Sequence, residues 1–308
     1  MYYEVFLLCM VKLDLEILEK LGKLTRELRK KVSSMPKEGM DITELIDFIE
    51  NRIFEEGYLP AFPCTVSVNE MAAHYTIFDE GYILKKGDLI KIDFGISENG
   101  FITDNAVTVE IGTNKYEKLM KANLEGLNAV MEKAQLGVSM SELGKTVHDV
   151  AVKNGFETIQ NLSGHQIAQY NLHCGLSVPN YENLDSREIG DNMELAIEPF
   201  FTMGEPKVKS AGPSNILHLI NDKPIRDSIA KKVLNYIREN YPRLPFSKRW
   251  LLKEFDKRKV LYALRVLKAH NIVYEYDALA TVDGAMVSQF EDAVVFVDGK
   301  KSIITRVK

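Results

Sequence analysis

The 308-residue sequence predicts an α+β fold with antiparallel strands and a helical insert in its second half. Apolar and polar residues alternate on both sides of Asn99-Gly100, which is the pattern of a β-hairpin. Two helices and then strands precede residue 112, and a similar order follows it. Helical spacing of apolar residues then returns between Asp227 and Ile272 and interrupts the second half. Nothing in this order resembles a dinucleotide-binding or phosphate-binding loop.

The first half contains two predicted helices and an extended segment. Leucines recur at helical spacing over residues 15–35 and predict the first helix. Asp41 and Glu44 form a capping-box pattern, so the second helix should begin there and end at Gly57. Two prolines within residues 60–63 then indicate an extended segment before the hairpin.

The second half alternates between helical and strand-like patterns. Serine is typical of a helix N-cap, and glycine typically follows the last turn of a helix. The predicted elements are a helix over residues 115–135, a helix from a cap at Ser139 or Ser141 to Gly155, short strands and loops over 157–212, and a closing strand over 295–307.

The composition is typical of a globular protein in a reducing compartment. Apolar residues make up 45% of the chain and charged residues 27%. Three cysteines without a CxxC pair indicate neither a disulfide framework nor a structural zinc site, so we expect a cytoplasmic protein. No apolar run has the length of a membrane span, so no membrane partner is expected. The start, MYYEVFLLCMVK, lacks the basic region and cleavage site of a signal peptide, and Met10 is an alternative start.

The net charge of -5 hides an uneven distribution. Between Lys231 and His270 there are twelve Lys and Arg residues against three Asp and Glu residues. Two interpretations of this basic segment are possible: a surface that faces nucleic acid, or a set of solvated helix faces.

Asp93 and Asp104 lie in the two arms of the predicted hairpin. A four-residue loop, Ser97 to Gly100, would place the two aspartates directly opposite each other. A two-residue loop would place Asp93 opposite Ala106 instead. Like charges in neighbouring positions destabilise a sheet, so either a bound cation or Lys91 should compensate them.

Further acidic and imidazole groups occur in strand-like, otherwise apolar surroundings, where charges need partners. They are His74 in NEMAAHYT, His165 and His173 in GHQIAQYNLHCG, Glu198 in ELAIEPF, and Glu291 in SQFEDAVVF. Carboxylate oxygens with one imidazole and no thiolate suit Mn, Fe(II), Co or Zn in a catalytic site. Four carboxylates are more than one divalent ion needs, which points to two ions. The other histidines, His148, His218 and His270, have an ordinary structural explanation.

The ordered motifs AFP, NEMAAHYT, KIDFG, FITDNAV, SGHQIAQYNLHCG, AIEPF and QFEDAV resemble those of the methionine aminopeptidases of type II, in an archaeal-like short form. The resemblance extends from about residue 13 to the end and includes LPFSKRWL and LKAHNIVYEY. It implies the pita-bread fold, with two pseudo-symmetric halves, for residues 1–213 and 278–308. Residues 214–277 would then form a helical, winged-helix-like insert.

The resemblance also implies a role for each motif residue. The implied metal ligands are Asp93, Asp104, His165, Glu198 and Glu291. With two ions over the hairpin, Asp93 and Asp104 would be opposed. The implied catalytic residues are His74, His173 and Glu198, and the implied substrate-binding residues are Phe62, His74, His173 and Tyr276.

The implied function is removal of the N-terminal methionine from nascent proteins by water activated between two divalent ions, Co, Mn, Fe(II), Zn or Ni. The implied protein is a monomer, and the basic insert would allow transient ribosome contact. The chain departs from the family pattern at Cys174, and at Asp292 and Ala293, where relatives carry His-Thr; Asp292 would add a carboxylate beside the site. Two alternatives remain: a non-catalytic, nucleic-acid-binding relative of the same fold, and a prolidase or aminopeptidase P.

Overall fold

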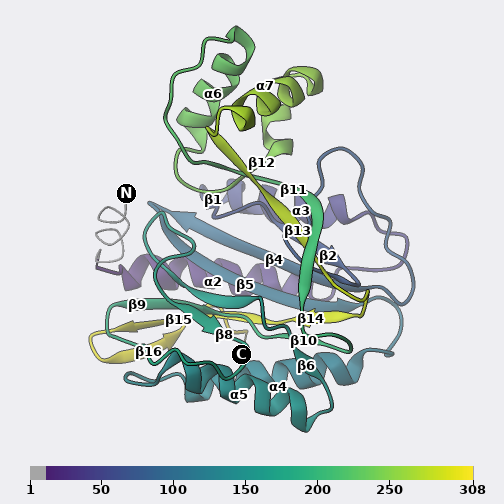
Figure 1. The fold of residues 1–308 in the computed structure, drawn as a ribbon, viewed down its shortest axis with the longest axis vertical. Helices are drawn as coiled ribbons and strands as arrows, with labels where there is room; N and C mark the ends of the chain where they lie inside the picture. The colour runs from purple at the N-terminus through teal and green to yellow at the C-terminus, as the bar shows by residue number, and fades with distance from the viewer. Residues whose placement is uncertain (1–11, 308) are drawn as a thin grey trace.

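The computed structural model describes residues 12–307. The fold is built around a large sheet with antiparallel pairing (Figure 1). Its nine strands follow the order β1-β4-β5-β15-β9-β7-β8, with β2 paired to β4 and β16 paired to β15. The bounds are β1 Leu59–Pro60, β2 Thr65–Val68, β4 Leu89–Glu98, β5 Phe101–Glu110, β7 Ser163–Ile167, β8 Ser177–Pro179, β9 Met193–Ile197, β15 Glu291–Val297 and β16 Lys300–Ile303. The expectations about the start of the chain, that it carries no signal peptide and that Met10 is an alternative start, concern residues 1–11, which lie outside the described part.

Four helices pack with this sheet around the main hydrophobic core. They are α2 (Leu15–Val32), α3 (Ile42–Glu55), α4 (Glu117–Lys133) and α5 (Met140–Lys153). The predicted capping box at Asp41 and Glu44 is present, and Ser139 is the N-cap of α5. Ile92 and Phe94 of β4 belong to this core, so the opposite face of the strand, with Asp93, points away from it. None of the described helices combines the length and apolarity required to span a bilayer.

The β4–β5 hairpin has a two-residue turn, so the prediction that Asp93 lies directly opposite Asp104 is wrong. Asp93 pairs with Ala106, and Asp104 pairs with Gly95. The reason is the turn, because Asn99 and Gly100 both have positive φ, 53° and 83°, as the tight primed hairpin turns require. The two aspartates still share one face as diagonal neighbours.

Two smaller sheets complete the fold. One has the order β14-β10-β6 and the other β12-β11-β13-β3. Their strands are β3 Met71–Ala73, β6 Glu157–Thr158, β10 Phe200–Thr202, β11 Val208–Leu219, β12 Phe246–Ser247, β13 Val273–Thr281 and β14 Val287–Gln289.

The long strands β11 and β13 carry the helical insert away from the large sheet (Figure 1). The insert helices are α6 (Ser228–Asn240), the 3₁₀ helix η1 (Lys248–Lys253) and α7 (Lys257–Ala269). They bury a hydrophobic cluster of their own, which includes Val233, Trp250 and Leu264. The predicted domain boundaries, 213/214 and 277/278, fall inside β11 and β13, so this division stays a prediction. Below, "insert" means residues 214–277 and "body" the rest of the described chain.

Candidate active site

All nine predicted site residues line one pocket with a volume of about 250 Å³. The hairpin, the ends of β9 and β15, the connection between β1 and β2, and the segments around β3, β7 and β13 supply them. They are Phe62, His74, Asp93, Asp104, His165, His173, Glu198, Tyr276 and Glu291. Motifs that are up to 229 positions apart in the sequence therefore meet in one cavity.

Several carboxylate oxygens in this pocket lack a hydrogen-bond partner. Asp93 Oδ1, Asp104 Oδ1 and Glu291 Oε2 are buried, and each has no hydrogen-bond partner. Burial raises the pKa of Asp93 to about 7, and hydrogen bonding from Gln289 opposes this rise. Burial, together with repulsion from the other acids, raises the pKa of Asp104 and Glu291 well above the ordinary range. The pKa of Glu198 is raised well above its ordinary value for the same two reasons.

No basic side chain of the described residues neutralises these acids from within the pocket, whose lining contains neither Lys nor Arg. The Lys91 ammonium points elsewhere and donates to the backbone oxygens of Asn69 at 2.6 Å and Leu89 at 3.4 Å. Lys91 is therefore not the partner of the aspartates, which leaves a cation as the remaining candidate of the two.

His165 completes a set that fits a divalent ion. Its Nε2 lies 3.5 Å from Asp104 Oδ2 and 3.9 Å from Glu198 Oε1. Asp104, His165 and Glu291 each offer a ligand atom within 4.8 Å of the others. Burial lowers the pKa of His165 well below its usual value, so the imidazole is neutral and able to bind a metal. Oxygen ligands with one imidazole match the hard donor set expected for a catalytic divalent ion.

Gln289 is a site residue that the sequence analysis missed. Its Nε2 donates to Glu198 Oε2 at 3.0 Å and lies 3.4 Å from Asp93 Oδ2. Thr108 holds the Gln289 backbone, since its Oγ1 donates to Gln289 O at 2.6 Å and accepts from Gln289 N at 2.9 Å. The available signal was the position of Gln289 two residues before Glu291, because alternate residues of an extended chain share a face.

The histidines and Tyr276 form one side of the pocket. His74 has a positive φ of 62°, a strained conformation of the kind that clusters at active sites, and its Nδ1 lies 3.2 Å from Asp277 O. The rings of His165 and His173 lie 4.3 Å apart. Burial and nearby histidines lower the pKa of His173 to about 4, so its imidazole is neutral at physiological pH.

His218 lies outside the pocket lining but contacts it through Tyr276, although the sequence gave His218 only a structural explanation. Its Nδ1 lies 3.3 Å from the hydroxyl of Tyr276. Its Nε2 lies 2.9 Å from the backbone oxygen of Arg243, so the ring bridges strand β11 to the loop before β12. His218 therefore supports Tyr276 from behind.

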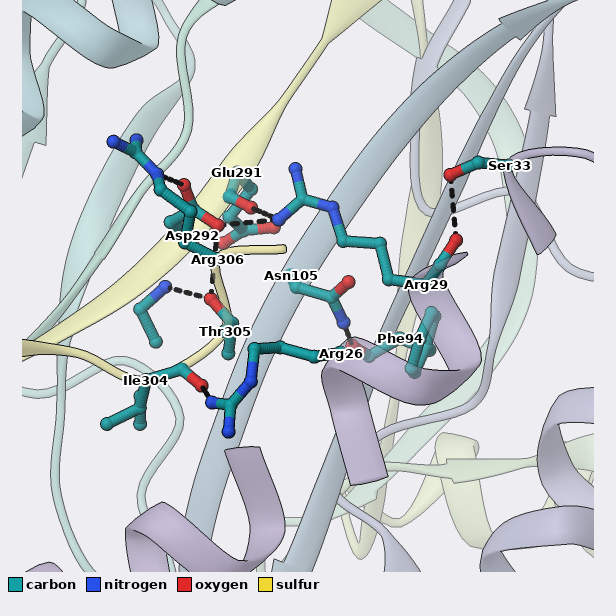
Figure 2. Close-up of polar contacts among 11 residues, drawn as sticks. Arg26, Arg29, Ser33, Phe94, Asn105, Glu291, Asp292, Ile304, Thr305 and Arg306 are labelled. Atoms are coloured by element: carbon teal, nitrogen blue, oxygen red, sulfur yellow. Dashed lines mark hydrogen bonds and ion pairs between the residues drawn. The ribbon is translucent and has the colours of Figure 1, made fainter. Parts of the chain in front are cut away.

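Asp292 does not add its carboxylate to the pocket, contrary to the sequence expectation. It alternates with Glu291 along β15 and forms ion pairs with Arg29 at 2.5 Å and Arg306 at 2.8 Å (Figure 2). Arg29 also donates to the backbone oxygen of Glu291 at 2.9 Å. Asp292 thus contributes to a buried ionic cluster on the other face of the sheet, which holds the strand that carries Glu291.

Comparison with known proteins identifies the family of the chain. The model of metallopeptidase family M24 matches residues 16–221. The chain is 38% identical to a methionine aminopeptidase of Pyrococcus horikoshii over 295 residues, which cover 95% of this chain and 100% of that protein. The chain belongs to metallopeptidase family M24. Members of this family use divalent metal ions, which agrees with the unpaired acids of the pocket.

Solved structures show that the M24 chain has the pita-bread fold predicted from its motifs. The methionine aminopeptidase of Rickettsia prowazekii superposes with a TM-score of 0.67 at 17% identity and covers 95% of this chain and 96% of its own. A thermophilic Arx1 superposes with a TM-score of 0.81 at 14% identity, covering 95% of this chain and 91% of its own. At such identities the likeness concerns the fold alone. The relatives found by sequence are methionine aminopeptidases and do not favour the non-catalytic or the prolidase alternative.

Proposed function

We propose that the chain removes the N-terminal methionine from polypeptides by metal-assisted hydrolysis of the first peptide bond. The observation that carries this proposal is the group of buried, unpaired acids beside His165 in one pocket, without a described Lys or Arg in the lining. Methionine aminopeptidases that are 38% identical over nearly the whole chain support the reaction.

We propose two divalent ions, because four carboxylates exceed the charge of one. The residues that would hold them are Asp93, Asp104, His165, Glu198 and Glu291. Co, Mn, Fe(II), Zn and Ni are the candidate metals. When bound, such ions lower the pKa of a water molecule and polarise a carbonyl group.

The protein groups then position the substrate and move the proton. Glu198 would accept a proton from the attacking water and deliver it to the leaving nitrogen. Its orientation is set by the 3.0 Å hydrogen bond from Gln289. His173, neutral because its pKa is lowered to about 4, would donate a hydrogen bond to the oxygen on which negative charge develops. His74, fixed by Asp277, would contact the scissile amide.

The apolar side of the pocket would select the first residue of the substrate. Phe62 and Tyr276 line the cavity from the body and from the insert. Aromatic rings suit a thioether, because sulfur makes favourable contacts with ring edges. Methionine is therefore the side chain that we assign to this pocket.

We also propose a cytoplasmic, monomeric enzyme that contacts the ribosome through its basic insert. Of the twelve basic residues between Lys231 and His270, six form ion pairs with acids, including Lys257 with Asp79. The available positive surface is therefore smaller than the sequence count indicates, and it includes Lys231 and Arg258. Ribosome binding should weaken with salt and after neutralisation of these two residues. Salt-independent binding would contradict this contact.

Hydrolysis of two substrates by the metal-loaded enzyme tests the proposed function. We expect release of free methionine from Met-Ala-Ser, no cleavage of an Xaa-Pro dipeptide, and loss of release in Glu291→Ala. Cleavage of the dipeptide in place of Met-Ala-Ser would indicate a prolidase. Failure of a folded, metal-loaded chain to cleave either peptide would favour the non-catalytic alternative.

A further inference from the structure

We propose that Glu50 is a positioning residue that holds the insert wall of the pocket against the body and so sets the selectivity for the first substrate residue. This inference rests on the proposed function, because it concerns the same pocket. Glu50 itself lies on helix α3 and outside the pocket lining.

The Glu50 carboxylate joins the body to the insert. On the body side, Oε1 accepts a hydrogen bond from the backbone N of Cys64 at 3.2 Å. On the insert side, Oε2 accepts from Trp250 Nε1 at 2.8 Å and from Arg249 Nη2 at 2.6 Å. The Glu50 side chain is only 4% exposed, and a carboxylate so far from water depends on such charge-assisted bonds.

Each end of this junction is close in sequence to a wall of the pocket. On the body side, Cys64 lies between Phe62 and Thr65, which both line the cavity. On the insert side, Pro245 lines the cavity four positions before Arg249.

A short strand between Pro245 and Arg249 connects the Glu50 junction to a second residue of the pocket lining. Ser247 of this strand, β12, pairs with Ile216, which also lines the pocket. Pro245 and Ile216 together form the part of the insert wall that lies next to the Glu50 junction.

Pro245 is buried, but cavities interrupt the packing around it. A second cavity, of about 270 Å³, adjoins it, so that Pro245 lines a cavity on each side. Close packing normally fixes a side chain in place, and a void removes those contacts. The second cavity lies at the seam between body and insert, with Phe54, Pro60 and Tyr170 on one side and Leu244 and Trp250 on the other. The position of Pro245 therefore depends on the attachment of Arg249 and Trp250 to Glu50.

Selectivity requires such a fixed wall. An apolar pocket distinguishes side chains that differ by one methylene by roughly 10-fold to 200-fold, and only while its dimensions hold. If the wall moves outward, side chains of other shapes enter, and methionine loses contacts at the same time.

Trp250 makes the test direct, because it is the only tryptophan of the chain. Glu50→Gln replaces a carboxylate that accepts three hydrogen bonds by a neutral amide, whose single oxygen cannot serve both the Cys64 side and the Trp250 and Arg249 side. In the metal-loaded enzyme we expect a red shift of Trp250 emission. We expect kcat for a Met-peptide to stay within about twofold and the preference for Met over Leu in the first position to fall about tenfold or more, with KM for the Met-peptide rising.

Asp47→Asn is the matched control. Asp47 lies on the same helix and forms an ion pair with the same Arg249, but its side chain is 47% exposed. We expect unchanged emission and an unchanged preference for Met. If Asp47→Asn and Glu50→Gln had equal effects, or if Glu50→Gln shifted the emission without altering the preference, the proposal would be overturned.

Two further measurements keep the test decisive. If Glu50→Gln does not fold, Trp250→Phe removes the N–H donor and keeps an aromatic ring, and an unchanged preference in this variant overturns the proposal. If the wild-type chain releases no methionine, the proposed function fails. Calorimetric binding of L-methionine against L-leucine to wild type and Glu50→Gln then decides the role of Glu50, and an equal preference in the two proteins contradicts it.

Discussion

The carboxyl groups of Asp104 and Glu291 oppose folding whenever no cation lies between them. Both are buried, and both pKa values are raised well above the ordinary range by burial and by repulsion from neighbouring acids. A group with a raised carboxyl pKa costs the folded state stability as the pH rises above the unfolded value, because the unfolded chain ionises more easily. The site is thus unfavourable on its own and becomes favourable with a cation.

Glu291→Gln should therefore stabilise the metal-free chain and abolish its stabilisation by metal. Removing one buried charge should raise the melting temperature of the metal-free chain, whereas added metal should stabilise only the wild type. At a metal concentration 100 times Kd the wild type should gain about 2.7 kcal/mol. Thermal unfolding with chelator and with Mn(II) measures both effects. An equal metal-dependent rise in the variant would show that Glu291 is not a ligand.

Gln289→Ala should lower kcat/KM by about 10-fold to 100-fold, the usual effect of losing a group that orients metal ligands. Its amide orients Glu198 and Asp93, so metal affinity should fall in parallel. Steady-state kinetics together with a metal titration measure this effect. Gln160→Ala, at an exposed position, is the control. Unchanged kinetics in Gln289→Ala would mean that the amide has no orienting role.

At the scale of single residues, the site residues in local motifs were predictable from the sequence. The residues that orient them through hydrogen bonds were not. Asp93 and Glu291 stand in recognisable local motifs. Gln289 acts through partners 91 and 196 positions away, and His218 acts through Tyr276, 58 positions away. Sequence periodicity reflects local structure and does not predict contacts between such distant residues.

At the scale of elements, local chemistry predicted helix starts well. The Asp41 and Ser139 capping boxes depend on residues three positions apart, which the sequence displays. The hairpin register was harder, because the apolar alternation fits both loop lengths. The positive φ of Asn99 and Gly100 decides between them. The turn chemistry of Asn-Gly is therefore better evidence for register than the expected opposition of Asp93 and Asp104.

Glu275 of strand β13 should stabilise the insert in a pH-dependent way. Burial opposes its charge, but hydrogen bonds from Lys248 and Lys268 prevail, and the pKa of Glu275 is lowered below 4.5. Because the folded pKa is depressed, this stabilisation is present above about pH 4.5 and is lost as the pH falls through the folded pKa. Glu275→Gln should cost about 1.5–3 kcal/mol at neutral pH and flatten the acid side of the stability profile.

Urea unfolding followed by Trp250 emission at several pH values measures this contribution. Glu254→Gln, an exposed acid of the same insert, is the control and should leave the profile unchanged. A Glu275→Gln profile with the same acid slope as the wild type would contradict the assignment.

At the scale of the whole molecule, the fold explains why one chain segment cannot form the site alone. The large sheet places the hairpin beside β15 and β9, so that Asp104, Glu291 and Glu198 approach from three separate parts of the sequence. The insert adds Pro245 and Tyr276 to the lining of the same pocket. The order of motifs made this convergence predictable through family resemblance, whereas composition and periodicity alone gave only the α+β class.

A titration of divalent metal into the metal-stripped chain, with free methionine released from Met-Ala-Ser as the signal, tests whether the buried acids bind the metal that hydrolysis requires. We expect no release without metal, and release that rises and saturates as ions fill the site. Glu291→Gln, folded under the same conditions, should stay inactive at every concentration. Methionine release that is independent of metal, or equal release by Glu291→Gln, would contradict the assignment of the buried acids as metal ligands.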